Sequence, residues 1–230
     1  MSTKTWRKSI NTFLATSLVA SVAVPVVPGT ANAETIATDL IISEYIEGSS
    51  FNKAIEIYNG TGKAIDLSNY TLEIYSNGAS TVSQAVTLSG TLENGDVYVL
   101  YNSQAVEAIK AVGDLENNTV INFNGDDTLV LKKGDTVIDS FGQVGVDPGT
   151  SWGTTVKTVD NTLIRNSKVL TGDTNPYDAF VPEVEWTGLG KDNFTDLGKH
   201  LSDGNPGGPV DPETPNVITI AEARTQGTGS

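Results

Sequence analysis

Carboxylates are the side chains best able to do chemistry in this sequence. The chain holds 28 Asp and Glu residues, one histidine (His200) and no cysteine. The lack of a thiol excludes thiolate nucleophiles and thiolate metal sites, and one histidine cannot build a His-rich zinc site. A Ser-His-Asp triad would rest on His200 alone. We therefore expect no catalytic residue in this chain.

The most informative carboxylates are Glu44 and Glu56, which lie in two consecutive strand candidates. If these strands form a hairpin, pairing Glu47 with Lys53 places Glu44 directly opposite Glu56. Like charges directly across a strand pair destabilise it. The sequence therefore predicts a compensating group close to these two side chains.

Two kinds of group could compensate the pair. A hard cation such as Ca²⁺ prefers carboxylate and carbonyl oxygens, which makes Glu44 and Glu56 calcium candidates. A guanidinium can instead fork onto carboxylates, and Arg165 lies in the strand-like segment 162–165. Because no D-x-D-x-D-G loop accompanies the pair, we favour a structural ion pair of Glu44, Glu56 and Arg165. No cofactor is expected.

Other acidic groups allow two interpretations. Asp126 and Asp127, and the group Asp173, Asn175 and Asp178, each resemble half of a calcium loop. Asp and Asn are also common in tight turns, where they hydrogen-bond to their own backbone. Neither spacing matches a dedicated calcium loop, so we expect turns. A carboxylate pair for glycoside hydrolysis is a weaker hypothesis, since the sequence cannot place two carboxylates across a cleft.

Two tryptophans outside the N-terminal segment could bind a ligand or fill a core. Exposed aromatic rings can form a stacking platform for sugars or bases, whereas buried ones close the ends of an apolar core. Trp152 lies in a glycine-flanked turn and Trp186 in a late strand candidate. We expect both to be core residues.

The first 33 residues have the pattern of a Sec-type signal peptide. Lys4, Arg7 and Lys8 precede an apolar run, and Ala31 and Ala33 fit the small-x-small cleavage site. A membrane anchor is the alternative, but prolines interrupt the run, which is short for the roughly 30 Å hydrocarbon layer. We expect cleavage after Ala33, secretion to the extracellular side, and no membrane attachment afterwards.

Removal of this segment makes the chain strongly acidic. The segment carries three of the 14 basic residues and no acidic one, which leaves 11 basic against 28 acidic residues, a net charge of −17. Affinity for nucleic acid comes largely from Lys and Arg displacing condensed counterions. We therefore expect no direct binding of nucleic acid.

From residue 39 onward the sequence predicts short strands separated by turns. The segments are rich in β-branched and aromatic residues, and Asn-Gly and Gly-Asp pairs separate them. Strand candidates occupy residues 40–46, 54–58, 71–75, 84–88, 97–101, 120–123, 128–131 and 136–141. One short helix is predicted at residues 103–112 from its apolar spacing. The fold class expected is all-β, an antiparallel sandwich over residues 38–201.

The C-terminal part has a different composition. Residues 202–216 are rich in Gly and Pro and predict an extended linker. Residues 217–230 begin a new apolar pattern that is too short to bury a core. They are expected to be the start of a second, truncated domain.

The order of several motifs resembles the lamin-tail domain, an immunoglobulin-like sandwich found in nuclear lamins and secreted bacterial proteins. The motifs are L-I-I-S-E-Y at 40–45, K-A-I-E-I-Y-N at 53–59, D-L-S-N-Y at 66–70, D-S-F-G-Q at 139–143 and P-G-T-S-W-G at 148–153. The version at the front of bacterial extracellular nucleases is the most similar, and it shares segments up to His200. Residues 218–229 resemble the entry of the OB-like domain that often follows there.

The resemblance implies a non-catalytic accessory module of a secreted nuclease or phosphoesterase. Its partner would be a downstream catalytic domain or another surface partner. Two alternatives remain: a free-standing module that binds cell-wall glycan, and, less favoured, a small hydrolase in its own right. The sequence has no pattern that sets an oligomeric state.

Overall fold

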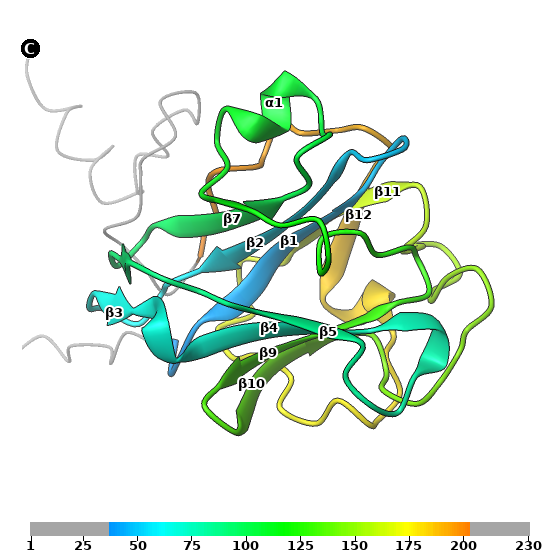
Figure 1. The fold of residues 1–230 in the computed structure, drawn as a ribbon, viewed down its shortest axis with the longest axis horizontal. Coiled ribbons are helices and arrows are strands. Elements are labelled where there is room, and N and C mark those ends of the chain that lie inside the picture. The colour runs from blue at the N-terminus through cyan, green and yellow to red at the C-terminus, as the bar shows by residue number, and fades with distance from the viewer. Residues whose placement is uncertain (1–36, 203–230) are drawn as a thin grey trace, which may run out of the picture. The chain divides into compact units, whose positions relative to one another are not determined.

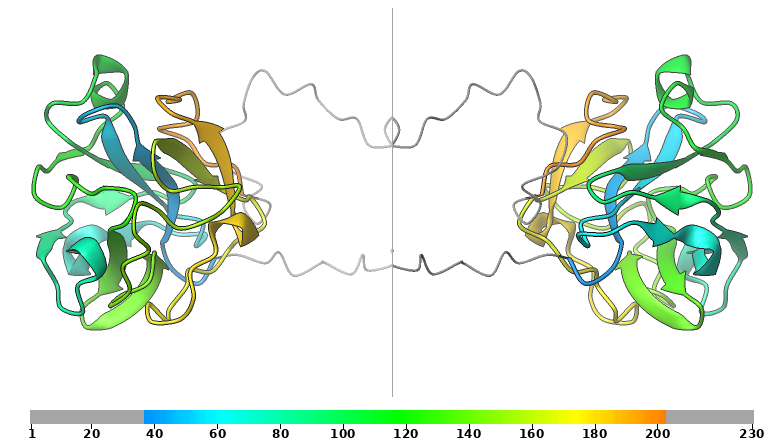
Figure 2. Two further views of the ribbon diagram at one scale, coloured as in Figure 1. Left: turned by 90° about the vertical axis from the view of Figure 1, so that its right-hand side faces the viewer. Right: turned by 90° about the vertical axis from the view of Figure 1, so that its left-hand side faces the viewer.

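The computed structural model describes residues 37–202, and these form two packed β-sheets and a small third one (Figures 1 and 2). A six-stranded sheet has the order β12-β11-β1-β2-β7-β8, with β1 (Ile41–Glu47), β2 (Lys53–Tyr58), β7 (Val97–Tyr101), β8 (Leu115–Glu116), β11 (Asn161–Arg165) and β12 (Trp186–Gly190). A four-stranded sheet has the order β10-β9-β4-β5, with β4 (Tyr70–Tyr75), β5 (Gln84–Thr87), β9 (Thr128–Lys133) and β10 (Thr136–Phe141). Strands β3 (Ile65–Asp66) and β6 (Thr91–Leu92) pair separately. The predicted all-β sandwich is confirmed.

Helical structure in residues 37–202 is limited to single turns. They are α1 (Glu107–Lys110) and three 3-10 turns, Leu67–Asn69, Ser76–Gly78 and Pro182–Val184. The predicted helix at 103–112 is therefore shorter than expected. In the described residues no helix is long and apolar enough to cross a membrane.

The β1–β2 hairpin has the predicted register. Glu47 pairs with Lys53, and Glu44 lies directly opposite Glu56. The Lys53 ammonium and the Glu47 carboxylate also form an ion pair of 2.6 Å. Since side chains alternate between the two faces of a strand, this register decides which side of the sheet each glutamate occupies.

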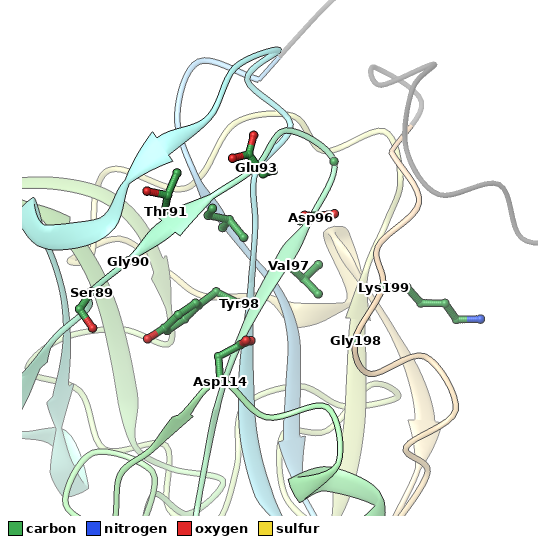
Figure 3. A pocket seen from close by; sticks show the side chains of 12 residues that line it. Ser89, Gly90, Thr91, Glu93, Asp96, Val97, Tyr98, Asp114, Gly198 and Lys199 are labelled. Carbon is green, nitrogen blue, oxygen red and sulfur yellow. The ribbon is translucent and has the colours of Figure 1, made fainter.

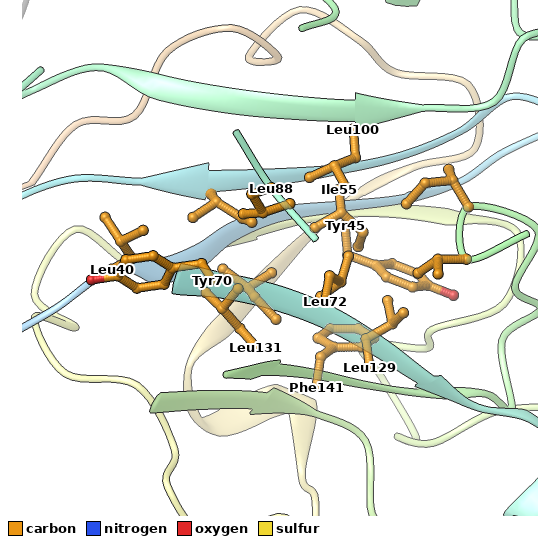
Figure 4. Close-up of a cluster of buried hydrophobic side chains, with 14 of the residues drawn as sticks. Leu40, Tyr45, Ile55, Tyr70, Leu72, Leu88, Leu100, Leu129, Leu131 and Phe141 are labelled. Carbon is orange, nitrogen blue, oxygen red and sulfur yellow. The ribbon is translucent and has the colours of Figure 1, made fainter. Parts of the chain in front are cut away.

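The main core lies between the two large sheets (Figure 4). Tyr45 stacks on Phe141 with ring centroids 4.2 Å apart and on Phe123 at 4.8 Å. Such aromatic pairs add about 0.5–1.5 kcal/mol each beyond their burial. The predicted strand at 120–123 is not a strand, although Val120, Ile121 and Phe123 are fully buried. The Asn102 side chain donates to the Ile121 carbonyl at 2.8 Å. This buried carbonyl therefore has a side-chain partner in place of the backbone partner that a neighbouring strand would supply.

A second, smaller apolar cluster lies on the outer face of the six-stranded sheet. It joins Ile46, Ala54 and Val99 of three neighbouring strands to Ile109 of α1 and Leu197. Leu197 belongs to residues 192–200, which we call the strap. In Figure 1 the last described residues, drawn in orange, pass beside α1 and behind β7 and β2. The strap covers polar as well as apolar side chains of this face.

The signal peptide, most of the linker and the start of a second domain fall outside the described residues. These predictions concern 1–33, 202–216 (of which only Ser202 is described) and 217–230.

Candidate functional site

The candidate site is a pair of buried carboxyl groups beneath the strap. Glu44 and Glu56 lie side by side on β1 and β2, with exposed fractions of 1% and 0%. Glu56 accepts hydrogen bonds from the Ser43 hydroxyl at 2.7 Å and from the Gly198 backbone N–H at 2.8 Å, and the Lys199 backbone N–H also donates to it. Neither carboxyl oxygen of Glu44 has a hydrogen-bond partner. The pair therefore combines one satisfied and one unsatisfied buried carboxyl group.

The surroundings of the pair favour its protonated form. Burial raises the pKa of Glu44 to about 9, and the negative charges of Glu56 and Asp196 add to the shift. Burial raises the pKa of Glu56 to about 8, although its hydrogen bonds from Ser43 and Gly198 act in the opposite direction. Because the two groups are adjacent, they titrate as a coupled pair. At neutral pH both carboxyl groups are predominantly neutral.

Arg165 does not compensate this pair, so the predicted ion pair of Glu44, Glu56 and Arg165 is wrong. In β11, Ile164 is the residue that lies opposite Glu44, and Arg165 pairs with Trp186. Successive side chains of a strand point to opposite faces. Arg165 therefore points into the core, away from the face that carries the glutamates.

The actual partners of Arg165 form a buried network on the inner face. Its guanidinium contacts Asp139 at 2.5 Å and Glu185 at 2.6 Å and donates to the Ile42 carbonyl at 3.2 Å. The attraction of both carboxylates outweighs burial and raises the pKa of Arg165. Asp139 also accepts from the backbone N–H groups of Ile42 and Asp173 at 2.7 and 2.8 Å. The network thus joins β1, β10, β11 and the loop before β12.

Asp139 is the functional residue that sequence reasoning missed. In the sequence Asp139 is only the first residue of the D-S-F-G-Q motif, and the motif predicts no structural role for it. It lies in the interior of β10, next to Ile138, and is fully buried. An aspartate in the middle of a strand of apolar and β-branched residues is a usable indication, because a buried carboxylate requires a partner.

The calcium candidates do not gather into a larger acidic cluster in the described residues. Within residues 37–202 no group of three or more His, Asp or Glu side chains is arranged to hold a metal ion. Asp127 accepts from the backbone N–H groups of Asn77 and Asn124, both at 2.8 Å, and Asp173 accepts from Asn175 at 3.0 Å. The turn interpretation of Asp127 and Asp173 is therefore confirmed.

His200 is buried at the end of the strap. Its ring lies 4.8 Å from the ring of Tyr58, and its Nε2 atom has no hydrogen-bond partner. Burial lowers the pKa of His200 to about 4, and the charge of Arg165 adds to this effect. A general base works best with a pKa near the working pH, so His200 is a poor catalytic base.

The turn that contains Trp152 also carries a serine motif. Residues 149–153 read G-T-S-W-G and fit the G-x-S-x-G pattern of a nucleophile elbow. That pattern carries a nucleophile only at a strand-to-helix turn. Here no strand leads into it and no helix follows, since the next regular element is β11. Residues 149–153 therefore match the sequence pattern but do not form the strand-to-helix turn of a nucleophile elbow.

Both tryptophans are core residues, as predicted. Trp152 and Trp186 are 6% and 3% exposed. Trp186 packs edge-on against Phe141 at 5.0 Å, and Trp152 packs edge-on against Phe180 at 5.8 Å. Neither ring offers a face to a sugar or a base.

The glutamate pair does not line any of three surface cavities in the described residues. The cavity in Figure 3 has a volume of about 320 Å³ and lies beside the strap, between Tyr98, Asp114 and Gly198. A second, of about 400 Å³, lies next to Glu185 and Trp186. A third, of about 560 Å³, lies between α1 and the strap. The carboxyl pair is thus sealed from these openings.

This arrangement defines an immunoglobulin-like β-sandwich module whose buried ionisable groups hold strands and loops together. The family model of the Lamin Tail Domain matches residues 34–145, and this family comprises non-catalytic sandwich modules. The match contains Glu44, Glu56 and Asp139, whereas Arg165 and the strap lie beyond it. No curated protein and no solved structure matches the chain.

Proposed function

We propose that the chain is a secreted, non-catalytic module that positions a nuclease or phosphoesterase domain. The observation that carries the positioning role is the anchoring of the strap, through which the chain leaves the sandwich. Support for secretion comes from the N-terminal pattern ending at Ala33, and support for the enzyme partner comes from the resemblance described above.

The strap is attached to the sandwich along its whole length. Asp192 accepts from the Ser49 backbone N–H at 2.8 Å and from the Asn52 side chain at 2.9 Å. The Thr162 hydroxyl donates to the Asn193 carbonyl at 2.8 Å. Further along, Leu197, Gly198 and His200 contact the outer face of the sheet. An exit segment held at several separate points fixes the direction in which the following residues leave.

Close packing at the start of the strap supports the same role. A Cβ atom added at Gly48 would lie 2.4 Å from the Asp192 Oδ1 atom. The backbone of the turn between β1 and β2 therefore lies close against the Asp192 side chain. A flexible tether would not require such a fit.

The absence of catalysis is tested by zymography of the secreted chain. DNA, RNA and a phosphodiester substrate are supplied with Mg²⁺, Mn²⁺, Ca²⁺ or Zn²⁺. We expect no cleared zone, because Glu44 and Glu56 are buried beneath the strap and His200 is a poor base. Clearing by the purified chain that follows the protein through chromatography would contradict the proposal.

The positioning role is tested by backbone relaxation. NMR order parameters of rigid backbone are about 0.85, and those of flexible segments fall below about 0.6. We expect residues 192–200 to match the amides of β9. Values typical of a flexible tail would contradict positioning, and a stop codon directly after Ser230 would contradict the enzyme partner.

The glycan-binding alternative is tested by retention on purified cell-wall material. We expect the chain to remain in solution, since Trp152 and Trp186 are buried. Saturable retention that soluble glycan reverses would favour the binding module over the positioning module.

A further inference from the structure

The strap closes over two carboxyl groups that form no ion pair with any of residues 37–202. Arg165, the nearest predicted partner, points to the opposite face and is committed to Asp139 and Glu185. Glu44 is buried with both oxygens unpartnered. Burying an unpaired carboxylate costs much more than burying a neutral carboxyl group. The closed strap is therefore stable when Glu44 and Glu56 are protonated, and it is destabilised when they ionise.

We propose that residues 192–200 form a proton-dependent clasp, which stays closed while Glu44 and Glu56 hold their protons and opens when the pair ionises. The proposal is independent of any partner enzyme. On opening, the protons pass to water and the two carboxylates become hydrated. The Gly198 N–H then exchanges its bond to Glu56 for one to water.

The other ionisable groups around the pair come from the strap and from β2. Asp196 of the strap repels charge on both glutamates. Lys199 gives its backbone N–H to Glu56, and its side chain points away from the cavity rim in Figure 3. His200 packs on Tyr58 of β2, and burial lowers the pKa of His200 to about 4, which keeps it neutral when the pair titrates. The charges that contribute most to the raised pKa values of Glu44 and Glu56 are those of carboxylates.

The direction of the pH effect follows from linkage. In the closed state the pKa values of Glu44 and Glu56 are about 9 and about 8, against an ordinary value of 4.5. A raised pKa gives stability that is complete below the ordinary value and is lost as the pH rises through the raised one. Closure therefore weakens with rising pH, by at most about tenfold per pH unit for each carboxyl group.

Hydrogen exchange at the strap measures this opening directly. The protection factors of the Leu197 and Gly198 amides, corrected for the intrinsic rate, are followed from pH 5 to pH 9 in the full chain. We expect a fall of at least tenfold between pH 6 and pH 8. The amides of β9 serve as an internal reference for global unfolding, and their protection should change much less.

Two matched variants separate the clasp from a general charge effect. Glu44→Gln keeps the size of the side chain but cannot ionise, so its strap protection should be nearly independent of pH. Glu116→Gln removes one charge from an exposed position of β8 and should retain the pH dependence of the parent. Constant strap protection in the parent, or equal pH dependence in Glu44→Gln, would overturn the proposal.

Two further measurements keep the result unambiguous. If Ca²⁺ at millimolar concentration restores strap protection at pH 9 in the parent but not in Glu44→Gln, the pair is a cation site and the proton clasp is wrong. If Glu44→Gln does not fold, carboxyl ¹³C titration of the parent decides. Midpoints above pH 7 for the pair support the clasp, and midpoints near the ordinary value overturn it.

Discussion

The six-stranded sheet carries a buried cluster of ionisable groups on each face. The two clusters offset the desolvation cost of their carboxyl groups in different ways. On the inner face, Asp139 is fully buried but contacts the Arg165 guanidinium and three backbone N–H groups. On the outer face, Glu44 is buried to a similar degree with no partner for either oxygen. The inner cluster is stabilised by opposite charges, and the outer one by protons.

This difference predicts opposite responses to mutation and to pH. Removing one partner of a compensated buried pair leaves a charge without solvation. Removing an uncompensated carboxyl group should stabilise the folded protein at a pH where that group would ionise. The comparison therefore fails if substitutions on the two faces change stability in the same direction.

The largest effect is expected for Arg165→Met, which removes the charge but keeps an elongated side chain. Asp139 then stays buried without its guanidinium, and breaking such a pair costs about 3–5 kcal/mol. Urea unfolding at pH 7 measures the change. Lys191→Met is the matched control, because Lys191 forms an exposed pair with Asp160 and should cause little change. Equal stabilities of the two variants would mean that the inner network contributes nothing.

The next effect, of opposite sign, is expected for Glu44→Leu. At pH 9 the parent is destabilised by ionisation of the pair, because burial raises the pKa of Glu44 to about 9. Leucine cannot ionise, so the variant should be more stable than the parent by roughly 2 kcal/mol at pH 9. The gain should shrink toward pH 5, where the parent pair is protonated. Destabilisation at pH 9 would instead show that the Glu44 carboxylate has a favourable partner.

The sequence was sufficient to predict the sheets and the position of the glutamate pair. Alternating apolar residues and Asn-Gly turns marked most strands, and the pairing of Glu47 with Lys53 determined the register of Glu44 and Glu56. These features are local, because they depend on one hairpin. A single register therefore placed two residues correctly.

The partners of the pair depended on long-range geometry that local patterns do not contain. Arg165 and Ile164 are adjacent in sequence, yet only Ile164 shares a face with Glu44. A one-residue difference in alternation decides between the faces. The strap escaped prediction because residues 192–200 have no apolar period, and only Leu197 and the partly buried Phe194 contribute to the core cluster there. The role of Asp139 could not be predicted either, because its partners lie on segments that are distant in the sequence and meet only in the folded protein.

The smallest effect, and the finest test of the comparison, is expected for Ser43→Ala. The Ser43 hydroxyl donates to the Glu56 Oε1 atom at 2.7 Å, and this bond lowers the pKa of Glu56 against the effect of burial. Its loss should cost about 1 kcal/mol and raise the titration midpoint of the pair. Because the closed state loses this bond, and its ionised form loses most, strap opening should become more favourable at high pH than in the parent, measured by hydrogen exchange at Gly198. A midpoint that moves to lower pH would mean that ionised Glu56 is stabilised elsewhere, and the outer cluster would then be compensated like the inner one.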